Sequence, residues 1–300
     1  MRQGVFRDHP VRRQPKDRVH NLTKGRTHMA FPTEITVAQL SRLIGLPDSP
    51  TLIDVRTDED FRADPRLIPG STRKDHRHVS EWHVEHSGAP VIVLCEKGRK
   101  LSQGAAALLR CHGLAAESLE GGFDAWRSAR LPLLNLDRLS GRNADGRTVW
   151  VTRARPKVDR IACPWLIRRF VDPGAVFLFV PPADVVDVAE RFDAAPFDVE
   201  DVLWSHRGEK CTFDTMIEEL GLRSPPLDLL ASIVRGADTA RPDLAPQAAG
   251  LLAISLGLSR MYKDDLAQLE AGMLLYDAFY RWCRDATEET HNWPSPGKAS

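Results

Sequence analysis

The 300-residue sequence predicts an α/β domain, built as a parallel sheet flanked by helices, followed by a mainly helical α+β domain. Between about residues 33 and 133, short apolar strands alternate with helical segments, which is the pattern of a parallel sheet. Roughly the last hundred residues instead show the apolar periodicity of successive helices. The chain is also longer than one typical domain, so two domains are expected.

The predicted organisation has five segments. Residues 134–147 are polar and rich in Gly, Asn and Asp, which indicates a linker. The segments are a disordered basic tail (1–32), the first domain (33–133), the linker (134–147), the second domain (148–293) and a disordered tail (294–300).

Composition narrows the class of protein. The formal net charge is zero, and no apolar run approaches the roughly 18 residues that span a bilayer. Residues 1–28 lack the apolar stretch of a signal peptide, and the five scattered cysteines are typical of reduced thiols. A cytoplasmic protein is therefore expected. The tail 1–28 carries eight Lys/Arg and two acids; we interpret it as solvated chain, with Met29 as an alternative start and a nucleic-acid arm as the disfavoured alternative.

The elements of the first domain follow from local signals. Thr36 is placed to cap a helix, and the acids of DEDF favour a helix start through the helix dipole. The predicted elements, in order, are a helix from 37, a strand at 51–56, a helix from 58, a short helix in 79–88, a strand at 90–95, a helix at 102–112 ended by Gly113, a strand at 116–119 and a helix at 122–129.

The second domain opens with a β-rich piece and continues mainly as helices. Its predicted strands are TVWVTR and AVFLFV, with a helix through ACPWLIRRFV between them. The later predicted helices lie in TFDTMIEELGL, PLDLLASIVRGAD, AAGLLAISLGLSRM and DLAQLEAGMLLYDAFYRWCRDA.

The loop CEKGRKLS (95–102) is the first candidate site, because its cysteine ends a predicted strand and its serine opens a predicted helix. The thiolate is the reactive form of cysteine. A glycine turn with inward N–H groups, a helix N-terminus and nearby cations would favour that thiolate and form an anion cradle. The alternative is a buried structural cysteine beside a basic turn.

Residues 33–133 resemble a rhodanese domain. The resemblance is carried, in order, by LIDVR (52–56), IPGS (68–71), the cysteine loop and LEGGFDAW (119–126). It implies a sulfurtransferase in which Cys95 takes a sulfane sulfur from a donor such as thiosulfate, becomes a persulfide and passes the sulfur to a thiol or cyanide. No cofactor is implied for this transfer. The residues that it implies for binding the anionic donor are Glu96, Lys97, Gly98, Arg99, Lys100, Leu101 and Ser102. Asp54 and Arg56 would hold neighbouring loops, while Glu120, Gly121 and Gly122 would border the pocket.

One departure from that family concerns the length of the loop. The usual pattern is Cys-x-x-Gly-x-Arg, whereas Lys100 stands at the arginine position here and Leu101 intervenes before Ser102. We therefore predict a seven-residue loop, Cys95–Leu101. Rhodanese-like phosphatases share such a lengthened loop, but this chain lacks the arginine fork that grips a phosphoryl group. Phosphatase activity is the minor alternative.

Residues 148–293 resemble the chromate-resistance ChrB domain, through WVTRARPKVDRIACPWLIRRFVDPGAVFLFVP, HRGEKCTFDTMIEELGL and IVRGAD. His206, Glu209 and Cys211 lie close in sequence, and with Asp238 they form a candidate zinc or iron site. Asp159 and Cys163 are plausible additions, and ordinary packing of these groups is the alternative. The cations Arg160, Arg168 and Arg169 share one helical segment and suggest binding of an oxyanion such as chromate, or else a solvated helix face.

Three functions are weighed. The leading one is a cytoplasmic sulfurtransferase acting in chromate or oxyanion stress, with small-molecule donor and thiol acceptor as partners. The second is a chromate-responsive sensor or transcriptional regulator without catalytic turnover, and the third is a metal-binding module. The sequence does not predict the oligomeric state.

Overall fold

The computed structural model describes residues 33–86, 88–139 and 143–290. The two predicted tails (1–32 and 294–300) lie outside these residues, as does part of the predicted linker. Within the described ranges no helix combines the length and the apolar character that a membrane crossing requires.

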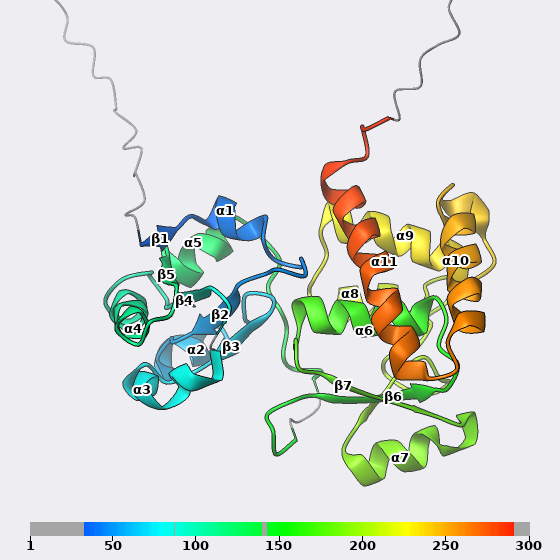
Figure 1. Ribbon diagram of the computed structural model, residues 1–300, viewed down its shortest axis with the longest axis horizontal. Coiled ribbons are helices and arrows are strands. Elements are labelled where there is room, and N and C mark those ends of the chain that lie inside the picture. Colours follow the sequence, from blue (N-terminus) through cyan, green and yellow to red (C-terminus); the bar gives the residue numbers. More distant parts are fainter. Residues whose placement is uncertain (1–32, 87, 140–142, 291–300) are drawn as a thin grey trace, which may run out of the picture.

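The first domain is a five-stranded parallel sheet in the order β1-β5-β4-β2-β3 (Figure 1). Its strands are β1 (Glu34–Ile35), β2 (Thr51–Asp54), β3 (Ser71–Arg73), β4 (Val91–Leu94) and β5 (Ala116–Leu119). Its helices are α1 (Val37–Ser41), α2 (Asp58–Ala63), α3 (Val79–Trp82), α4 (Lys100–Cys111) and α5 (Gly122–Ser128), with 3₁₀ turns at His76–His78 and His83–His86.

Helices cover both faces of this sheet, which explains why β2 and β4 are continuous apolar runs. Ile53 and Val93 pack with α3 and α4, whereas Leu52, Ile92 and Leu94 belong to the core that contains α1 and α5. The predicted α/β architecture is therefore confirmed, and the carboxyl end of β4 leads directly into the cysteine loop.

Local capping signals also act as the sequence suggests at the start of α1. The Thr36 side chain accepts from the Gln39 amide, and the Gln39 side chain accepts from the Thr36 amide, which together form a capping box. The helix is short and ends at Ser41, because the chain turns through Gly45, which has a φ of +82°.

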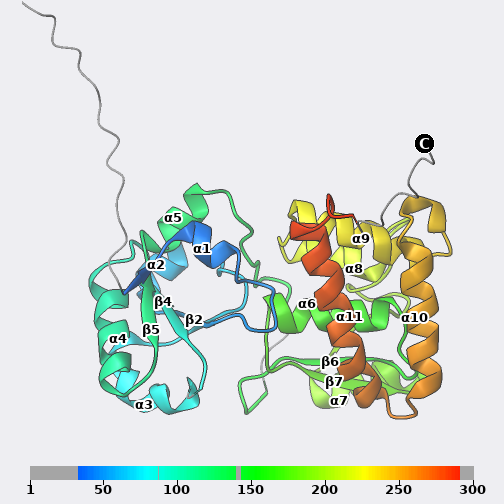
Figure 2. The ribbon, with the colours of Figure 1, turned by 45° about the horizontal axis from the view of Figure 1, so that its top comes forward.

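The second domain has a small parallel sheet in the order β7-β6-β8. Figure 2 shows the helices that make up most of this domain beside strands β6 and β7. Its strands are β6 (Val149–Arg153), β7 (Val176–Val180) and β8 (Ala195–Pro196). Its helices are α6 (Asp159–Phe170), α7 (Val185–Phe192), α8 (Thr212–Glu219), α9 (Pro225–Asp238), α10 (Ala248–Met261) and α11 (Asp265–Asp285), with 3₁₀ turns at Pro182–Asp184 and Pro242–Leu244. The predicted α+β class is confirmed.

The two domains share one hydrophobic core, to which strands and helices of both contribute. The Gly70 amide donates to the Phe170 carbonyl oxygen at 2.7 Å, which ties the two domains together. A Cβ on Gly45 would lie 2.3 Å from the Phe170 ring, so this close approach requires glycine. At the start of the polar segment 134–147, Leu134 is 1% exposed and pairs with Leu67.

Candidate functional site

Cys95 lies at the carboxyl end of β4, with 5% of its surface exposed. Its Sγ is 3.2 Å from the Ser102 Oγ and 3.9 Å from the Arg99 carbonyl oxygen. Ser102 is fully buried, and its hydroxyl also lies 3.1 Å from that carbonyl oxygen. The hydroxyl can rotate, so it can donate to the carbonyl beside a thiol or to the sulfur of a thiolate. The arrangement suits a negative charge on Cys95.

The loop after Cys95 rests against the turn that begins α5. Gly98 and Gly122 both have a φ of +61° and pack backbone to backbone. A Cβ on Gly122 would lie 2.1 Å from the Cys95 carbonyl oxygen, and one on Gly98 would lie 2.5 Å from the Gly122 nitrogen. The Phe123 amide donates to that same Cys95 carbonyl at 3.0 Å. Only glycine fits these two positions, so they fix the path of the loop.

The predicted helix start at Ser102 is wrong by two residues. Helix α4 begins at Lys100 after Arg99, which makes no side-chain capping bond. Lys100 and Leu101 thus form the first helical turn rather than loop. The reason is that the Ser102 hydroxyl does not cap the helix but turns inward to Cys95 and to the Arg99 carbonyl. Leu101, the residue that lengthened the predicted loop, therefore lies in helix α4.

The three cations predicted around Cys95 are exposed. They are Lys97, Arg99 and Lys100. Within the described ranges none of them forms an ion pair, which leaves their charges free to attract an anion. Gly98 is buried beneath them.

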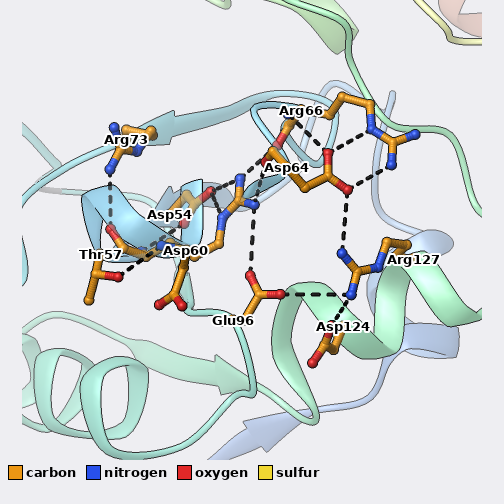
Figure 3. Close-up of polar contacts among 10 residues, drawn as sticks. Asp54, Thr57, Asp60, Asp64, Arg66, Arg73, Glu96, Asp124 and Arg127 are labelled. Atoms are coloured by element: carbon orange, nitrogen blue, oxygen red, sulfur yellow. Dashed lines mark hydrogen bonds and ion pairs between the residues drawn. The ribbon is translucent and has the colours of Figure 1, made fainter. Parts of the chain in front are cut away.

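A buried ion pair at the end of β2 stabilises the segments next to the cysteine loop (Figure 3). The Arg56 Nη2 lies 2.7 Å from the Asp54 Oδ2, and both side chains are fully buried. The Arg56 guanidinium also donates to the Asp64 carbonyl oxygen at 3.0 Å and stacks 3.8 Å from the Phe123 ring centroid. These contacts agree with the expectation that Asp54 and Arg56 hold neighbouring loops.

The Glu96 carboxylate points toward Arg127 in this ion-pair network (Figure 3). Its carboxylate lies 3.9 Å from Arg56 and 3.8 Å from Arg127, and Arg127 also pairs with Asp124. Burial, followed by the nearby Asp124 charge, raises the pKa of Glu96 above its usual value. Its side chain thus positions the loop, and an anion could be met here only by its backbone.

A second cluster of polar groups lies in the second domain around His206. The His206 Nε2 is 3.2 Å from Asp238, 3.4 Å from Asp198 and 3.7 Å from Asp159. Asp159 and Asp198 are buried, whereas the His206 side chain is 41% exposed. Hydrogen bonds to Asp198 and then Asp238 raise the pKa of His206 to about 10. Burial, then the Asp238 and Asp198 charges, raise the pKa of Asp159.

Asp159 and Asp198 are each fixed by further bonds. The Thr212 amide donates to the Asp159 Oδ2 at 2.7 Å, so Asp159 caps the start of α8. The Arg153 Nη2 and the Arg160 Nε lie 2.9 and 3.2 Å from the Asp198 Oδ2. Both carboxylates are therefore held with one side toward His206.

The predicted metal ligands are only partly brought together. His206 and Asp238 meet as expected, and Asp159, a plausible addition, joins them. Cys211 instead precedes α8, where its Sγ lies 3.2 Å from Asp214, and exposed Glu209 is outside the cluster. Sequence reasoning missed Asp198, which follows the two-residue strand β8 and carries no motif.

The three arginines of the α6 segment do not form a shared oxyanion site. Arg160 pairs with Asp198, Arg168 with Glu270 and Arg169 with Asp277. Each guanidinium already contacts its own carboxylate.

Comparison with known proteins agrees with this geometry. A parallel sheet with a cysteine loop after its central strand defines a rhodanese-like, sulfurtransferase-type domain, and residues 36–129 match the rhodanese-like domain family. The chain is 33% identical over 103 residues to a thiosulfate sulfurtransferase of Pseudoalteromonas translucida, which it covers to 93%. The chain therefore belongs to the rhodanese family, and residues 150–283 match the ChrB C-terminal domain.

Two further similarities are partial. The chain is 34% identical over 148 residues to Protein ChrB of Cupriavidus metallidurans. That match covers 49% of this chain and 44% of the relative's length. A solved rhodanese-related protein from Thermoplasma volcanium is 24% identical, with 34% of this chain and 96% of that chain covered and a TM-score of 0.30.

Proposed function

We propose that this chain is a cytoplasmic rhodanese-type sulfurtransferase that carries sulfane sulfur as a Cys95 persulfide and acts in resistance to chromate or related oxyanions. The observation that carries the proposal is the Cys95 Sγ at the carboxyl end of β4, 3.2 Å from the Ser102 hydroxyl and followed by the start of α4. The resemblance of residues 148–293 to the chromate-resistance domain supports the physiological part.

The proposed transfer has two balanced steps. In the first, the Cys95 thiolate attacks the sulfane sulfur of thiosulfate; a new S–S bond forms, the old one breaks, and sulfite leaves with the electron pair. In the second, a thiol or cyanide attacks the outer sulfur of the persulfide and Cys95 leaves as thiolate. The Ser102 hydroxyl and the first amides of α4 would stabilise the negative sulfur in both steps.

The exposed cations would attract the anionic sulfur donor to the loop. Lys97, Arg99 and Lys100 carry three positive charges on the surface around the loop. They would raise the local concentration of a dianion such as thiosulfate, an effect that weakens as salt is added. Glu96 would not oppose it strongly, since its carboxylate is turned toward Arg56 and Arg127.

Mass spectrometry after exposure to thiosulfate tests the proposal directly. The wild-type chain should gain one sulfur atom on the peptide that contains Cys95, and should form thiocyanate when cyanide is added. Cys95→Ser should abolish both, whereas Cys111→Ser, a change at an exposed cysteine outside the loop, should preserve both. Turnover that survives in Cys95→Ser would contradict the proposal.

The regulator alternative makes a different prediction. It requires DNA binding that changes with chromate and that survives Cys95→Ser. Gel-shift titrations with and without chromate, at two salt concentrations, separate it from the sulfurtransferase, since non-specific binding falls steeply with salt.

For the physiological role, cells that depend on this chain should lose chromate tolerance with Cys95→Ser.

A further inference from the structure

The geometry points to a binding site for a divalent transition cation in the second domain, formed by Asp159, Asp198, His206 and Asp238. One ligand atom each from Asp159, Asp198 and His206 lies within 4.8 Å of the others. Asp238 adds a carboxylate oxygen 3.2 Å from the His206 Nε2. This site lies in a different domain from Cys95 and does not depend on the proposed sulfur transfer.

The four side chains come from three segments of the chain that the fold brings together. Asp159 starts α6, Asp238 ends α9, Asp198 follows β8, and His206 lies between β8 and α8. Residues converging from such distant positions are not explained by a local turn. Burying the carboxylates of Asp159 and Asp198 costs free energy of folding, because a buried charge requires a compensating partner.

The outer contacts orient the carboxylates as ligands. Asp198 receives both of its guanidinium contacts on Oδ2, which leaves Oδ1 toward His206. The Asp159 Oδ2 accepts the Thr212 amide at 2.7 Å and keeps a further lone pair, whereas its Oδ1 accepts the Phe213 amide at 3.1 Å and the Cys163 thiol at 3.8 Å. Outer hydrogen bonds of this kind fix the direction of metal ligands.

A buried hydroxyl without a partner lies on the same side of the small sheet. Thr152 is 0% exposed, and its Oγ1 has no hydrogen-bond partner among the described residues. Since strand side chains alternate, Thr152 shares its face of β6 with Trp150. The Trp150 ring lies 6.4 Å from Phe197 and 5.8 Å from Trp204, which precede Asp198 and His206 by one and two residues. Thr152 thus lies on the face of β6 that packs against the segment containing Asp198 and His206.

Charge and access favour a cation. Three carboxylates face two guanidinium groups and His206, whose raised pKa favours the imidazolium, so a metal cation would bind by displacing that proton and would meet one net negative charge. Mixed imidazole and carboxylate ligands suit Mn²⁺, Fe²⁺ or Zn²⁺ better than Mg²⁺, which prefers oxygen ligands alone. The partial exposure of His206 (41%) and Asp238 (19%) leaves one side open for entry and for an exchangeable ligand.

The test uses the full chain after treatment with a chelator. Mn²⁺ binding is measured by the loss of the free-ion electron paramagnetic resonance signal, Zn²⁺ binding by calorimetry and elemental analysis, with Mg²⁺ for comparison. We expect one Mn²⁺ or Zn²⁺ per chain and weaker binding of Mg²⁺. His206→Gln and Asp238→Asn should each weaken binding about tenfold or more.

Two controls keep the result interpretable. Asp243→Asn removes an exposed carboxylate elsewhere in the domain and should leave binding unchanged. Cys95→Ser should also bind normally, which separates this site from sulfur transfer. Asp238→Asn serves as the milder variant, because the Asp238 side chain is partly exposed, whereas Asp159 caps α8. No stoichiometric binding in the wild type, or equal binding by correctly folded His206→Gln, overturns the inference.

Discussion

Replacing Ser102 with alanine tests whether this hydroxyl stabilises the reactive form of Cys95. The Ser102 Oγ lies 3.2 Å from the Cys95 Sγ and is fully buried, so its removal leaves a space too small for a replacing water. The helix start should survive the change, because the Arg99 carbonyl still accepts the Gln103 amide at 2.9 Å. The main loss is one hydrogen bond to sulfur.

The size of the effect follows from that one bond. A hydrogen bond to a charged group contributes about 1.5–3 kcal/mol, and about 1.4 kcal/mol corresponds to a tenfold change. Loss of this bond should therefore disfavour reaction at the Cys95 sulfur by roughly 10-fold to 150-fold before any compensation. A sulfur that has lost this hydrogen-bond donor is also more nucleophilic, which offsets nearly half of the logarithmic loss, so the alkylation rate should fall roughly 4-fold to 15-fold.

Alkylation by iodoacetamide near neutral pH, quantified for each cysteine by peptide mass spectrometry, measures this rate. Cys111 is exposed and provides an internal reference in the same sample. Ser71→Ala is the matched control, since Ser71 is also buried in this domain and its Oγ has no hydrogen-bond partner. A Cys95 rate in Ser102→Ala within twofold of the wild-type rate would refute the assigned role.

Three further predictions concern packing, burial and charge. Gly122→Ala should lower the free energy of unfolding by about 2–5 kcal/mol in urea titrations, because a left-handed backbone at a residue with a side chain and overpacking both cost free energy. The control Gly104→Ala, whose added Cβ meets no neighbouring atom, should raise the free energy of unfolding slightly. Cys111 should label rapidly in the native chain, while Cys163, whose thiol pKa is raised by burial, should label only on unfolding. Asp64 has a pKa lowered to about 2, chiefly by its hydrogen bond from Arg66, so its stabilisation is present above pH 4 and lost toward pH 2; the Tm deficit of Asp64→Asn should shrink over that range.

Most of the fold was predictable because its strong signals are local. The buried strands β2 and β4 are short apolar runs, and the long helices α9 and α11 have clear apolar periodicity. Four elements were missed besides the 3₁₀ turns: β1, β3, α7 and β8. The two residues of β8 are too few to show a period, and α7 packs on the small sheet through only two buried residues, Val185 and Ala189.

The two candidate sites also differ in how local their sequence signals are. The cysteine loop is one continuous segment, so its residue types and glycines were visible in sequence, and only the helix start was misplaced. The cluster around His206 is assembled from three segments that are distant in sequence: the start of α6, the connection between β8 and α8, and the end of α9. Proximity in sequence favoured Cys211 and Glu209, but Cys211 is held beside Asp214 at the start of α8, and tertiary packing supplies Asp198 in its place.

Both candidate sites use the same property of parallel sheets. Cys95 follows β4, while Asp198 follows β8 and Asp159 begins the helix after β6, so each set lies beyond the carboxyl ends of its strands. At those ends the backbone leaves the sheet, and side chains can converge without interrupting a strand. The faces of the first sheet are filled by helices, and the core is shared through contacts such as Gly70 with Phe170. The packed core therefore supports both candidate sites, and Cys95, Asp198 and Asp159 all lie beyond strand ends, where loops and helix starts set the direction of each side chain.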